Sequence, residues 1–216
     1  MKITHYGHAC VLVEIERDGN TVRLLLDPGT YSTDFEDVRD LDAVLITHEH
    51  PDHLDVSRLG PLLANNSTAR VIVDPGSSKV LRESGLQHET VSKGDTVVLG
   101  GLNVQVLAGD HEVIHPRIPC VHNNGYLIDG QVLHPGDAFA VPPQPVSVLL
   151  LPTGGPWMKV SEAIDYLQAV APDTAIPIHQ AGLAAVHQQL HLHLFRNLAP
   201  AQCTVQVLDH GTPTTI

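Results

Sequence analysis

An apolar run passes directly into four potential metal ligands in the stretch Ala43-Val44-Leu45-Ile46-Thr47-His48-Glu49-His50-Pro51-Asp52-His53. The four aliphatic residues indicate a buried β-strand, so the ligands follow at its end. Residues two apart in an extended segment project to the same side, which allows His48 and His50 to bind one ion. After the bend at the proline, Asp52 and His53 can face a second ion, and nitrogen and oxygen donors suit Zn²⁺ or a similar metal. The stretch therefore predicts the first half of a two-metal site.

Length and composition indicate a single domain over residues 1–216, because 216 residues that are 43% hydrophobic suffice for a large core. The formal net charge is −12, and the twelve lysines and arginines form no cluster. We therefore expect no nucleic-acid partner, since such proteins neutralise phosphates with basic side chains. A small anionic substrate would need a local cationic pocket, for which Lys159, Arg117 and Lys79 are the few candidates.

The three cysteines, Cys10, Cys120 and Cys203, are odd in number and far apart, which favours reduced thiols over a disulfide framework. The chain has no signal-type segment and no apolar run near 18 residues. We expect a cytoplasmic protein that acts on a small molecule, makes no membrane contact and has a possible homo-oligomeric state. Cys10 lies in an apolar pattern and is expected to be a small buried hydrophobe.

Strand patterns occur in blocks with helix patterns between them. Strands are expected at 2–6, 10–16, 21–26, 43–47, 70–73, 96–107 (around Gly100-Gly101), 125–128, 131–134, 146–151, 174–178 and 203–208, and helices at 54–64, 77–85, 160–170 and 182–198. This order predicts an αββα sandwich, in which two sheets stack face to face and the helices cover the outside. In the last helix we expect a buried stripe of Leu183, Val186, Leu190 and Leu194.

Two metals need more ligands than the first loop supplies, and three candidates follow strand patterns elsewhere. They are His111, Asp137 and His179. Each has an ordinary explanation as well, because a lone histidine is often a surface or capping residue and Asp137 can be a turn residue. Asp110 and His115 compete with His111 for the ligand role, and His111 is preferred because it lies nearest the strand end.

The complete set resembles the signature of the metallo-β-lactamase superfamily, in which an H-x-H-x-D-H loop precedes a later His, Asp and His. Here the set is His48, His50, Asp52, His53, His111, Asp137 and His179. Four segments are similar to the small cytosolic branch of metal-dependent hydrolases: Tyr6-Gly7-His8-Ala9, Leu26-Asp27-Pro28, Gly136-Asp137 and Leu151-Pro152-x-Gly154-Gly155. That branch includes proteins similar to the ascorbate-6-phosphate lactonases, and the resemblance runs from residue 1 to about 210.

The resemblance implies a four-layer sandwich with two divalent metal ions, Zn²⁺ first and Mn²⁺ or Fe²⁺ as alternatives. One ion would be bound by the first two histidines and His111, the other by Asp52, His53 and His179, with Asp137 bridging both. A bridging hydroxide, oriented by Asp52, would hydrolyse a small ester, lactone or phosphodiester.

Other roles are less defined by the sequence. His115 or His8 would supply a proton to the leaving group, and Asp27 would orient a metal-bound imidazole. The segment Gly154-Gly155-Pro156-Trp157 is either a cleft-lining loop or an ordinary turn. The alternatives for the whole protein are an iron-dependent redox or oxygen-activating protein and a non-catalytic metal-binding protein.

Overall fold

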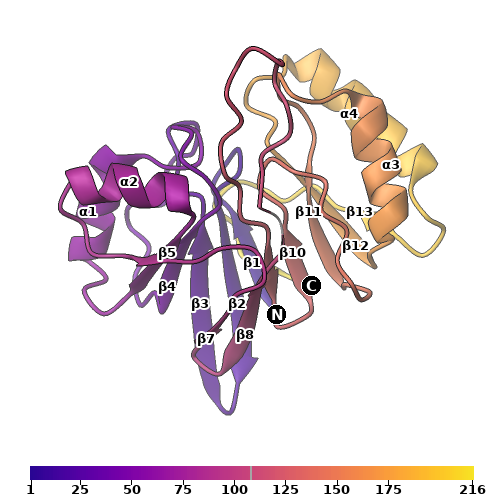
Figure 1. The fold of residues 1–216 in the computed structure, drawn as a ribbon. Helices are drawn as coiled ribbons and strands as arrows, with labels where there is room; N and C mark the ends of the chain where they lie inside the picture. The colour runs from indigo at the N-terminus through magenta and orange to yellow at the C-terminus, as the bar shows by residue number, and fades with distance from the viewer. Residues whose placement is uncertain (108) are drawn as a thin grey trace.

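The computed structural model describes residues 1–107 and 109–216, and within these residues two seven-stranded sheets stack face to face. Helices cover the outer face of each sheet, α1 and α2 on one side and α3 and α4 on the other (Figure 1). The predicted αββα sandwich is confirmed. None of the described helices is both long and apolar enough to cross a lipid bilayer.

The first sheet is formed by β1 (Lys2–His5), β2 (Val11–Arg17), β3 (Asn20–Leu26), β4 (Ala43–Ile46), β5 (Arg70–Val73), β6 (Glu89–Thr90) and β14 (Thr214–Thr215). Its spatial order is β14–β1–β2–β3–β4–β5–β6. Strands β2 and β3, both expected from the sequence, form a hairpin with Asp18 and Gly19 as its two-residue turn. Both turn residues have positive φ angles, 51° and 82°, as a turn that matches the twist of the strands requires.

The second sheet is formed by β7 (Thr96–Leu99), β8 (Leu102–Val106), β9 (Tyr126–Ile128), β10 (Val132–His134), β11 (Val148–Pro152), β12 (Thr174–Ile178) and β13 (Thr204–Val205). Its order is β13–β12–β11–β10–β9–β8–β7. The four strands β10 to β13 run parallel. Their carboxyl ends therefore meet at one edge, the edge from which Asp137 and His179 extend.

The helices are α1 (Val56–Ala64), α2 (Pro75–Glu83), α3 (Val160–Val170) and α4 (Ala185–Leu198). The side chain of Asp55 caps α1 by accepting from the backbone N–H groups of Ser57 and Arg58. Asp74 caps α2 in the same way, and Pro75 occupies the first turn, where its missing N–H costs nothing. Each cap starts its helix directly after a strand or loop of the first sheet.

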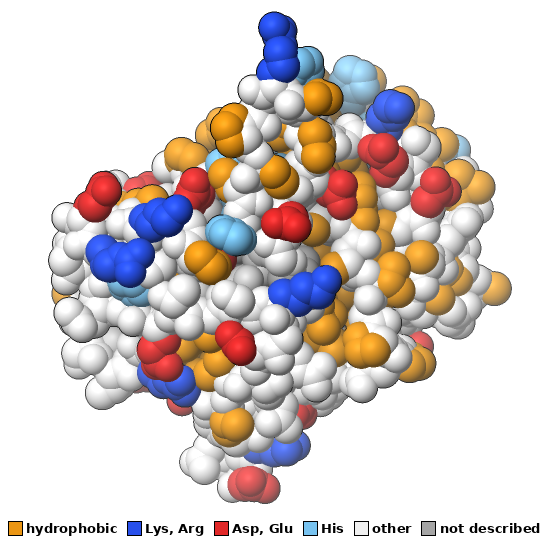
Figure 2. All heavy atoms as spheres, viewed as in Figure 1, with side chains coloured by type: hydrophobic (Ala, Val, Ile, Leu, Met, Phe, Trp, Pro, Cys, Tyr) orange, Lys and Arg blue, Asp and Glu red, His pale blue; other side chains and the backbone are white. Residues whose placement is uncertain are grey.

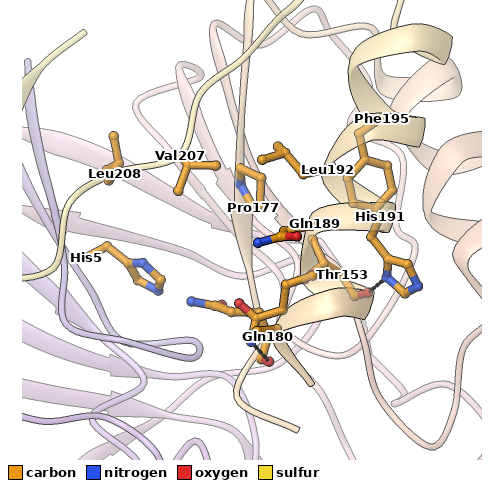
Figure 3. Close-up of a pocket in the computed structure, with 12 residues that line it drawn as sticks. His5, Thr153, Pro177, Gln180, Gln189, His191, Leu192, Phe195, Val207 and Leu208 are labelled. Atoms are coloured by element: carbon orange, nitrogen blue, oxygen red, sulfur yellow. Dashed lines mark hydrogen bonds between the residues drawn. The ribbon is translucent and has the colours of Figure 1, made fainter. Parts of the chain in front are cut away.

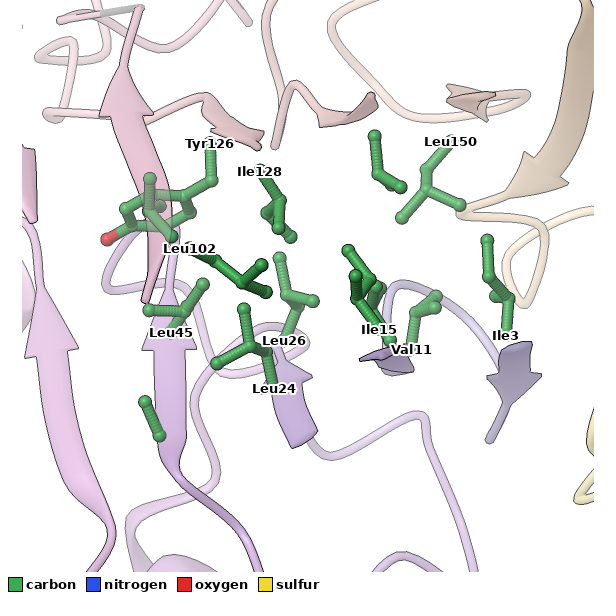
Figure 4. Close-up of a cluster of buried hydrophobic side chains, with 14 of the residues drawn as sticks. Ile3, Val11, Ile15, Leu24, Leu26, Leu45, Leu102, Tyr126, Ile128 and Leu150 are labelled. Carbon is green, nitrogen blue, oxygen red and sulfur yellow. The ribbon is translucent and has the colours of Figure 1, made fainter. Parts of the chain in front are cut away.

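The main core lies between the two sheets, where aliphatic side chains from both meet (Figure 4). Its fully buried members include Ile3, Val11, Leu24, Leu26, Leu45, Leu102, Tyr126, Ile128 and Leu150. Tyr126 links the sheets, because its hydroxyl donates to the carbonyl of Ile46 over 2.8 Å. This bond fixes the end of β4, from which the histidine loop departs. Cys10 is fully buried in the neighbouring core, as predicted.

Two predictions about the C-terminal region are wrong. The strand expected at 203–208 is only the two-residue β13, and the expected stripe on α4 is not buried: Val186 is 67% exposed and Leu190 50%. Phe195 is instead the buried residue of α4 and packs with Leu192 against the second sheet. Helix α4 carries apolar residues on two of its faces. The periodicity of the sequence therefore cannot predict which face packs against the sheet.

Candidate metal centre

The candidate ligands come together at one edge of the sandwich, and both sheets contribute. His48, His50, Asp52 and His53 lie in the loop after β4 of the first sheet. His111 follows β8, Asp137 follows β10 and His179 follows β12 of the second sheet. All of these side chains except those of His50 and Asp52 are buried. The seven residues are therefore gathered where the two sheets meet, as the sequence predicts.

The first cluster consists of His48, His50, His111 and Asp137, whose ligand atoms all lie within 4.8 Å of one another. His48 Nε2 lies 3.0 Å from His50 Nδ1, and His111 Nε2 lies 3.3 Å from Asp137 Oδ2. Three ring nitrogens and one carboxylate oxygen thus point at a common centre. Such a set suits Zn²⁺, Mn²⁺ or Fe²⁺.

The second cluster consists of His8, Asp52, His53 and His179, again within 4.8 Å. His179 Nε2 lies 3.6 Å from Asp52 Oδ2, and His53 Nε2 lies 3.9 Å from the same oxygen. The three residues predicted for the second ion are therefore brought together. His8 joins them; the sequence indicates this residue only as a possible proton donor near the site and not as a member of the cluster.

Asp137 lies between the two clusters. Its Oδ1 is 3.2 Å from His53 Nε2, and its Oδ2 is 3.2 Å from His179 Nε2 as well as 3.3 Å from His111 Nε2. One carboxylate therefore reaches histidines of both groups. This position is the one that a ligand shared by two ions would occupy.

The protonation of the rings fits a metal. Three ring Nδ1 atoms face oxygens that can only accept: His53 faces Asp27 Oδ2 at 2.7 Å, His111 the carbonyl of Glu112 at 2.5 Å, and His179 the carbonyl of Gly154. Each Nδ1 therefore carries the proton, which leaves an unprotonated Nε2 pointing inward. These three Nε2 atoms and Asp137 Oδ1 are buried and make no hydrogen bond to any described residue. Four unpaired polar atoms in one place are costly unless an ion binds them.

Asp27 is fully buried behind the histidine loop. Besides His53, it accepts from the backbone N–H and the hydroxyl of Thr47, at 2.8 and 2.7 Å. The predicted hydrogen bond between Asp27 and an imidazole is therefore present. Its backbone φ of 46° also makes it a turn residue.

His8 holds Asp52 in place. Its Nε2 lies 3.1 Å from Asp52 Oδ2, and its Nδ1 accepts from the backbone N–H of Ala181 over 3.3 Å. Since Nδ1 is an acceptor, the proton is on Nε2 and is donated to Asp52. Burial lowers the pKa of His8 to about 4 despite this bond, so the ring is neutral at pH 7. A neutral His8 orients the Asp52 carboxylate by a hydrogen bond and leaves its negative charge available for a metal ion.

The electrostatics of the centre favour positive charge. Burial alone would raise the pKa of Asp137, but His53 and His179 hold it well below its usual value. For Asp52, burial is likewise outweighed by the hydrogen bond from His8 and by the nearby His53, and its pKa falls to about 2. Burial opposes charge on His53, but without an ion Asp137 and Asp27 raise its pKa well above the ordinary value. A cation bound at Nε2 would take the place of that extra proton. Both candidate carboxylate ligands are thus ionised at neutral pH, as metal ligands must be.

Close backbone packing sets the loops around the centre. A Cβ on Gly29 would lie 1.8 Å from the carbonyl oxygen of Asp52, so only glycine allows this approach. Gly136 has a φ of 62°, and a Cβ there would lie 2.1 Å from Asn123 Oδ1. That oxygen accepts from the backbone N–H of Asp137 over 2.9 Å. Asn123 therefore positions Asp137, a role for which the sequence carries no recognisable signal.

The competing candidates near His111 lie elsewhere. His115 is exposed, and its Nδ1 accepts from the backbone N–H of Arg117. Asp110 is exposed as well, and neither residue belongs to a cluster found among the described residues. The choice of His111 over these two agrees with the geometry. The proton-donor role of His115 stays a prediction that its contacts do not support.

A cleft of about 490 Å³ opens beside the second cluster and is lined in part by Gly154, Gly155 and Pro156. Of the two alternatives that the sequence leaves open for this segment, these three residues fit the cleft-lining loop. Trp157 is 7% exposed and lies edge-on to His111 and His179, with ring centroids 5.8 and 6.0 Å away. Trp157 therefore packs against one histidine of each cluster.

A separate cavity of about 240 Å³ lies behind this loop, between α4 and residues 207–208 (Figure 3). Thr153, Gln180 and His5 line it, and His191 bonds to the carbonyl of Thr153 over 2.8 Å. The cavity and the cleft are thus lined by neighbouring residues of the same two loops: Thr153 and Gln180 line the cavity, and Gly154 and His179 line the cleft.

Comparison with known families agrees with this geometry. The family model described as "Beta-lactamase superfamily domain" matches residues 2–179. The chain therefore belongs to the metallo-β-lactamase superfamily, the family that its ligand pattern resembles.

Individual relatives are consistent with this assignment. Protein Rv0786c of Mycobacterium tuberculosis is 48% identical over 189 residues, which are 85% of this chain and 86% of the relative. The UPF0173 metal-dependent hydrolase MJ1163 of Methanocaldococcus jannaschii is 26% identical over 191 residues, 82% of this chain and 83% of its own length. The solved structure of the metallo hydrolase Igni18 from Ignicoccus hospitalis has a TM-score of 0.72 at 24% identity, covering 99% of this chain and 97% of that one, and shows the fold alone. With the two ligand clusters, the family and these relatives make the chain a metal-dependent hydrolase.

Proposed function

We propose that the protein is a binuclear hydrolase of a small ester, lactone or phosphodiester. His48, His50 and His111 would hold one divalent ion, Asp52, His53 and His179 the other, and Asp137 both. The observation that carries the proposal is the position of Asp137, whose two oxygens lie 3.2 to 3.3 Å from histidines of the two clusters. Two bound ions would supply Lewis-acid chemistry, acidifying a water molecule and polarising the scissile carbonyl or phosphoryl group.

The residues around the ions would supply orientation. Asp52 stays ionised and is fixed by His8, so its carboxylate can hold the attacking water by a hydrogen bond. Asp27 fixes the ring of His53, and the carbonyls of Glu112 and Gly154 fix those of His111 and His179. Rigid donors lose little entropy when the reaction begins, which is what preorganised sites contribute to catalysis.

Elemental analysis of protein purified without a tag or chelator tests the metal assignment. We expect two zinc or manganese ions per chain, and fewer in the His179→Ala variant, together with ester hydrolysis that a chelator abolishes. Two iron ions per chain would instead favour the alternative of an iron-dependent redox or oxygen-activating protein. A chain that binds no metal even in metal-replete medium would show that the ligand assignment is wrong.

A further inference from the structure

The cleft beside the second cluster is built from five loops, which follow β1, β3, β4, β11 and β12. Its lining is His8, Thr30, Tyr31, Pro51, Asp52, Gly154, Gly155, Pro156, His179, Gly182 and Leu183. Three of these residues belong to the second cluster, so a molecule in the cleft has one end at the reacting centre. The volume of about 490 Å³ is within the usual range for small-molecule sites.

Away from the cluster, the cleft carries no charge. Among the described residues that line it there is no lysine or arginine, and Asp52 is the one acidic group. The candidates considered from the sequence, Lys159, Arg117 and Lys79, do not line it. The small depression on the other side of the centre, beside His50 and His111, also has no basic residue in its described lining, and it includes Glu112.

Several basic side chains are engaged in ion pairs elsewhere. Arg58 pairs with Asp55 and Glu36, at 2.7 and 2.8 Å. Arg70 pairs with Glu89 over 2.7 Å. Figure 2 shows acidic and basic side chains interspersed over one face of the molecule. With a net charge of −12, the protein as a whole repels anions, and beyond the candidate metal centre the described lining of this cleft supplies no compensating cation.

The uncharged lining has its own chemistry. Leu183, Pro156 and Pro51 present apolar surface, and Tyr31, 59% exposed, stands edge-on to the ring of His8 with centroids 5.2 Å apart. An aliphatic or aromatic group gains contact area here. A phosphate or carboxylate would lose its water without gaining a partner, which is costly.

We infer that the cleft binds the uncharged, partly apolar portion of the substrate. The substrate class is esters and lactones that bear no charge away from the reacting atoms, and molecules with a remote phosphate or carboxylate are rejected. This inference rests on the proposed function. In the reaction, water gives its hydroxyl to the acyl carbon and its proton to the leaving oxygen as the acyl–oxygen bond breaks.

Gly182 allows a matched test, because a Cβ at this position meets nothing within 4 Å and its φ is not in the left-handed region. Gly182→Lys adds a cation to the cleft, and Gly182→Met adds a side chain of similar length without charge. The substrates form a second matched pair: 4-nitrophenyl butyrate and 4-nitrophenyl hemisuccinate, which differ by a terminal carboxylate. Leu183→Lys and Leu183→Met serve as a second pair of variants if the first pair does not fold.

For the wild-type protein, we expect kcat/KM for the butyrate to exceed that for the hemisuccinate by about tenfold or more, because the carboxylate is unpaired. The lysine variant should narrow this ratio by about fivefold, the effect of one partly exposed ion pair, and the methionine variant should not. Equal use of both esters, or equal ratios in the two variants, would overturn the inference and leave the hydrolase proposal standing. Fully metal-loaded protein that hydrolyses neither ester, nor bis(4-nitrophenyl) phosphate, in a chelator-sensitive way would overturn both.

Discussion

Single residues behind the candidate ligands decide how the ligands point. His8 is the most informative of them, because it bonds to Asp52, 44 positions away in the sequence, while its backbone is in the left-handed region with a φ of 48°. Its two ring nitrogens have separate tasks, one accepting from Ala181 and one donating to Asp52. Substitutions can therefore separate these tasks.

We expect His8→Asn to lower the kcat of ester hydrolysis about tenfold, the effect of losing one hydrogen bond to a charged group. Asparagine tolerates the left-handed backbone and can replace Nδ1 towards Ala181, but it is too short to reach Asp52. His8→Gln places an amide near the position of Nε2 and should restore part of kcat. Metal content measured on the same samples should stay unchanged; a loss of metal that parallels the loss of kcat would show that His8 is a ligand instead.

Asp27→Asn should weaken binding of the second metal. The amide presents a donor to the Nδ1–H of His53, so the ring loses its acceptor, and such changes behind a ligand typically cost about 10- to 100-fold in affinity. Competition with a chromophoric chelator measures this. Asp42→Asn is the control, since that carboxylate accepts from the backbone N–H of Arg23, away from the histidines. Unchanged affinity in Asp27→Asn would mean that Asp27 only shapes the turn.

At the scale of the elements, the site is positioned by loops that follow different strands and pack closely against one another. The loop after β3 lies against the loop after β4, and Thr30 donates from its backbone N–H to the carbonyl of Pro51 over 2.8 Å. Gly29 makes this contact possible. The position of the second cluster therefore depends on a residue that carries no functional group.

Gly29→Ala should lower the free energy of unfolding by about 1–3 kcal/mol, the usual effect of overpacking, because the new methyl group forces the two loops apart. Chemical denaturation measures the change. Gly182→Ala, which meets no neighbouring atom, should change stability by less than about 0.5 kcal/mol. Equal stability of the two variants would contradict the close packing of the loops.

The sequence predicts several elements of four or more residues well and the two-residue strands poorly. Strand β5, strand β12 and helix α3 begin and end where their patterns indicate. The two-residue strands β6 and β14 are too short to show any period, and the exposed stripe of α4 shows that periodicity does not choose between two apolar faces. At the site, ligand types and strand ends indicate the seven candidates, but Asn123 and the partners of His8 depend on contacts between distant segments. The roles of the seven as ligands stay a prediction.

On the scale of the whole molecule, the centre joins the two halves of the sandwich. One sheet provides the loop of residues 48–53, and the other provides His111, Asp137 and His179. Metal bound here would cross-link the sheets and stabilise the folded chain over the unfolded one, by about 2.7 kcal/mol at a metal concentration 100 times the dissociation constant.

Chelation should therefore lower the Tm. For a chain of this size, 1 kcal/mol corresponds to about 2–4 °C, so we expect a decrease of about 5–10 °C in differential scanning calorimetry. The His179→Ala variant should begin from a lower Tm and respond less to the chelator. A metal-loaded protein whose Tm is the same before and after metal removal would show that the centre contributes nothing to holding the sheets together.

The division of the centre between the two sheets also sets an order of events during synthesis. A nascent chain presents its first four donors early, in the loop that ends at His53, but the shared carboxylate at 137 and the last histidine at 179 leave the ribosome much later. An ion captured by the early loop alone would have an incomplete coordination sphere and would exchange freely. Stable metallation, and with it hydrolysis, would mark a chain whose two halves have already closed on each other.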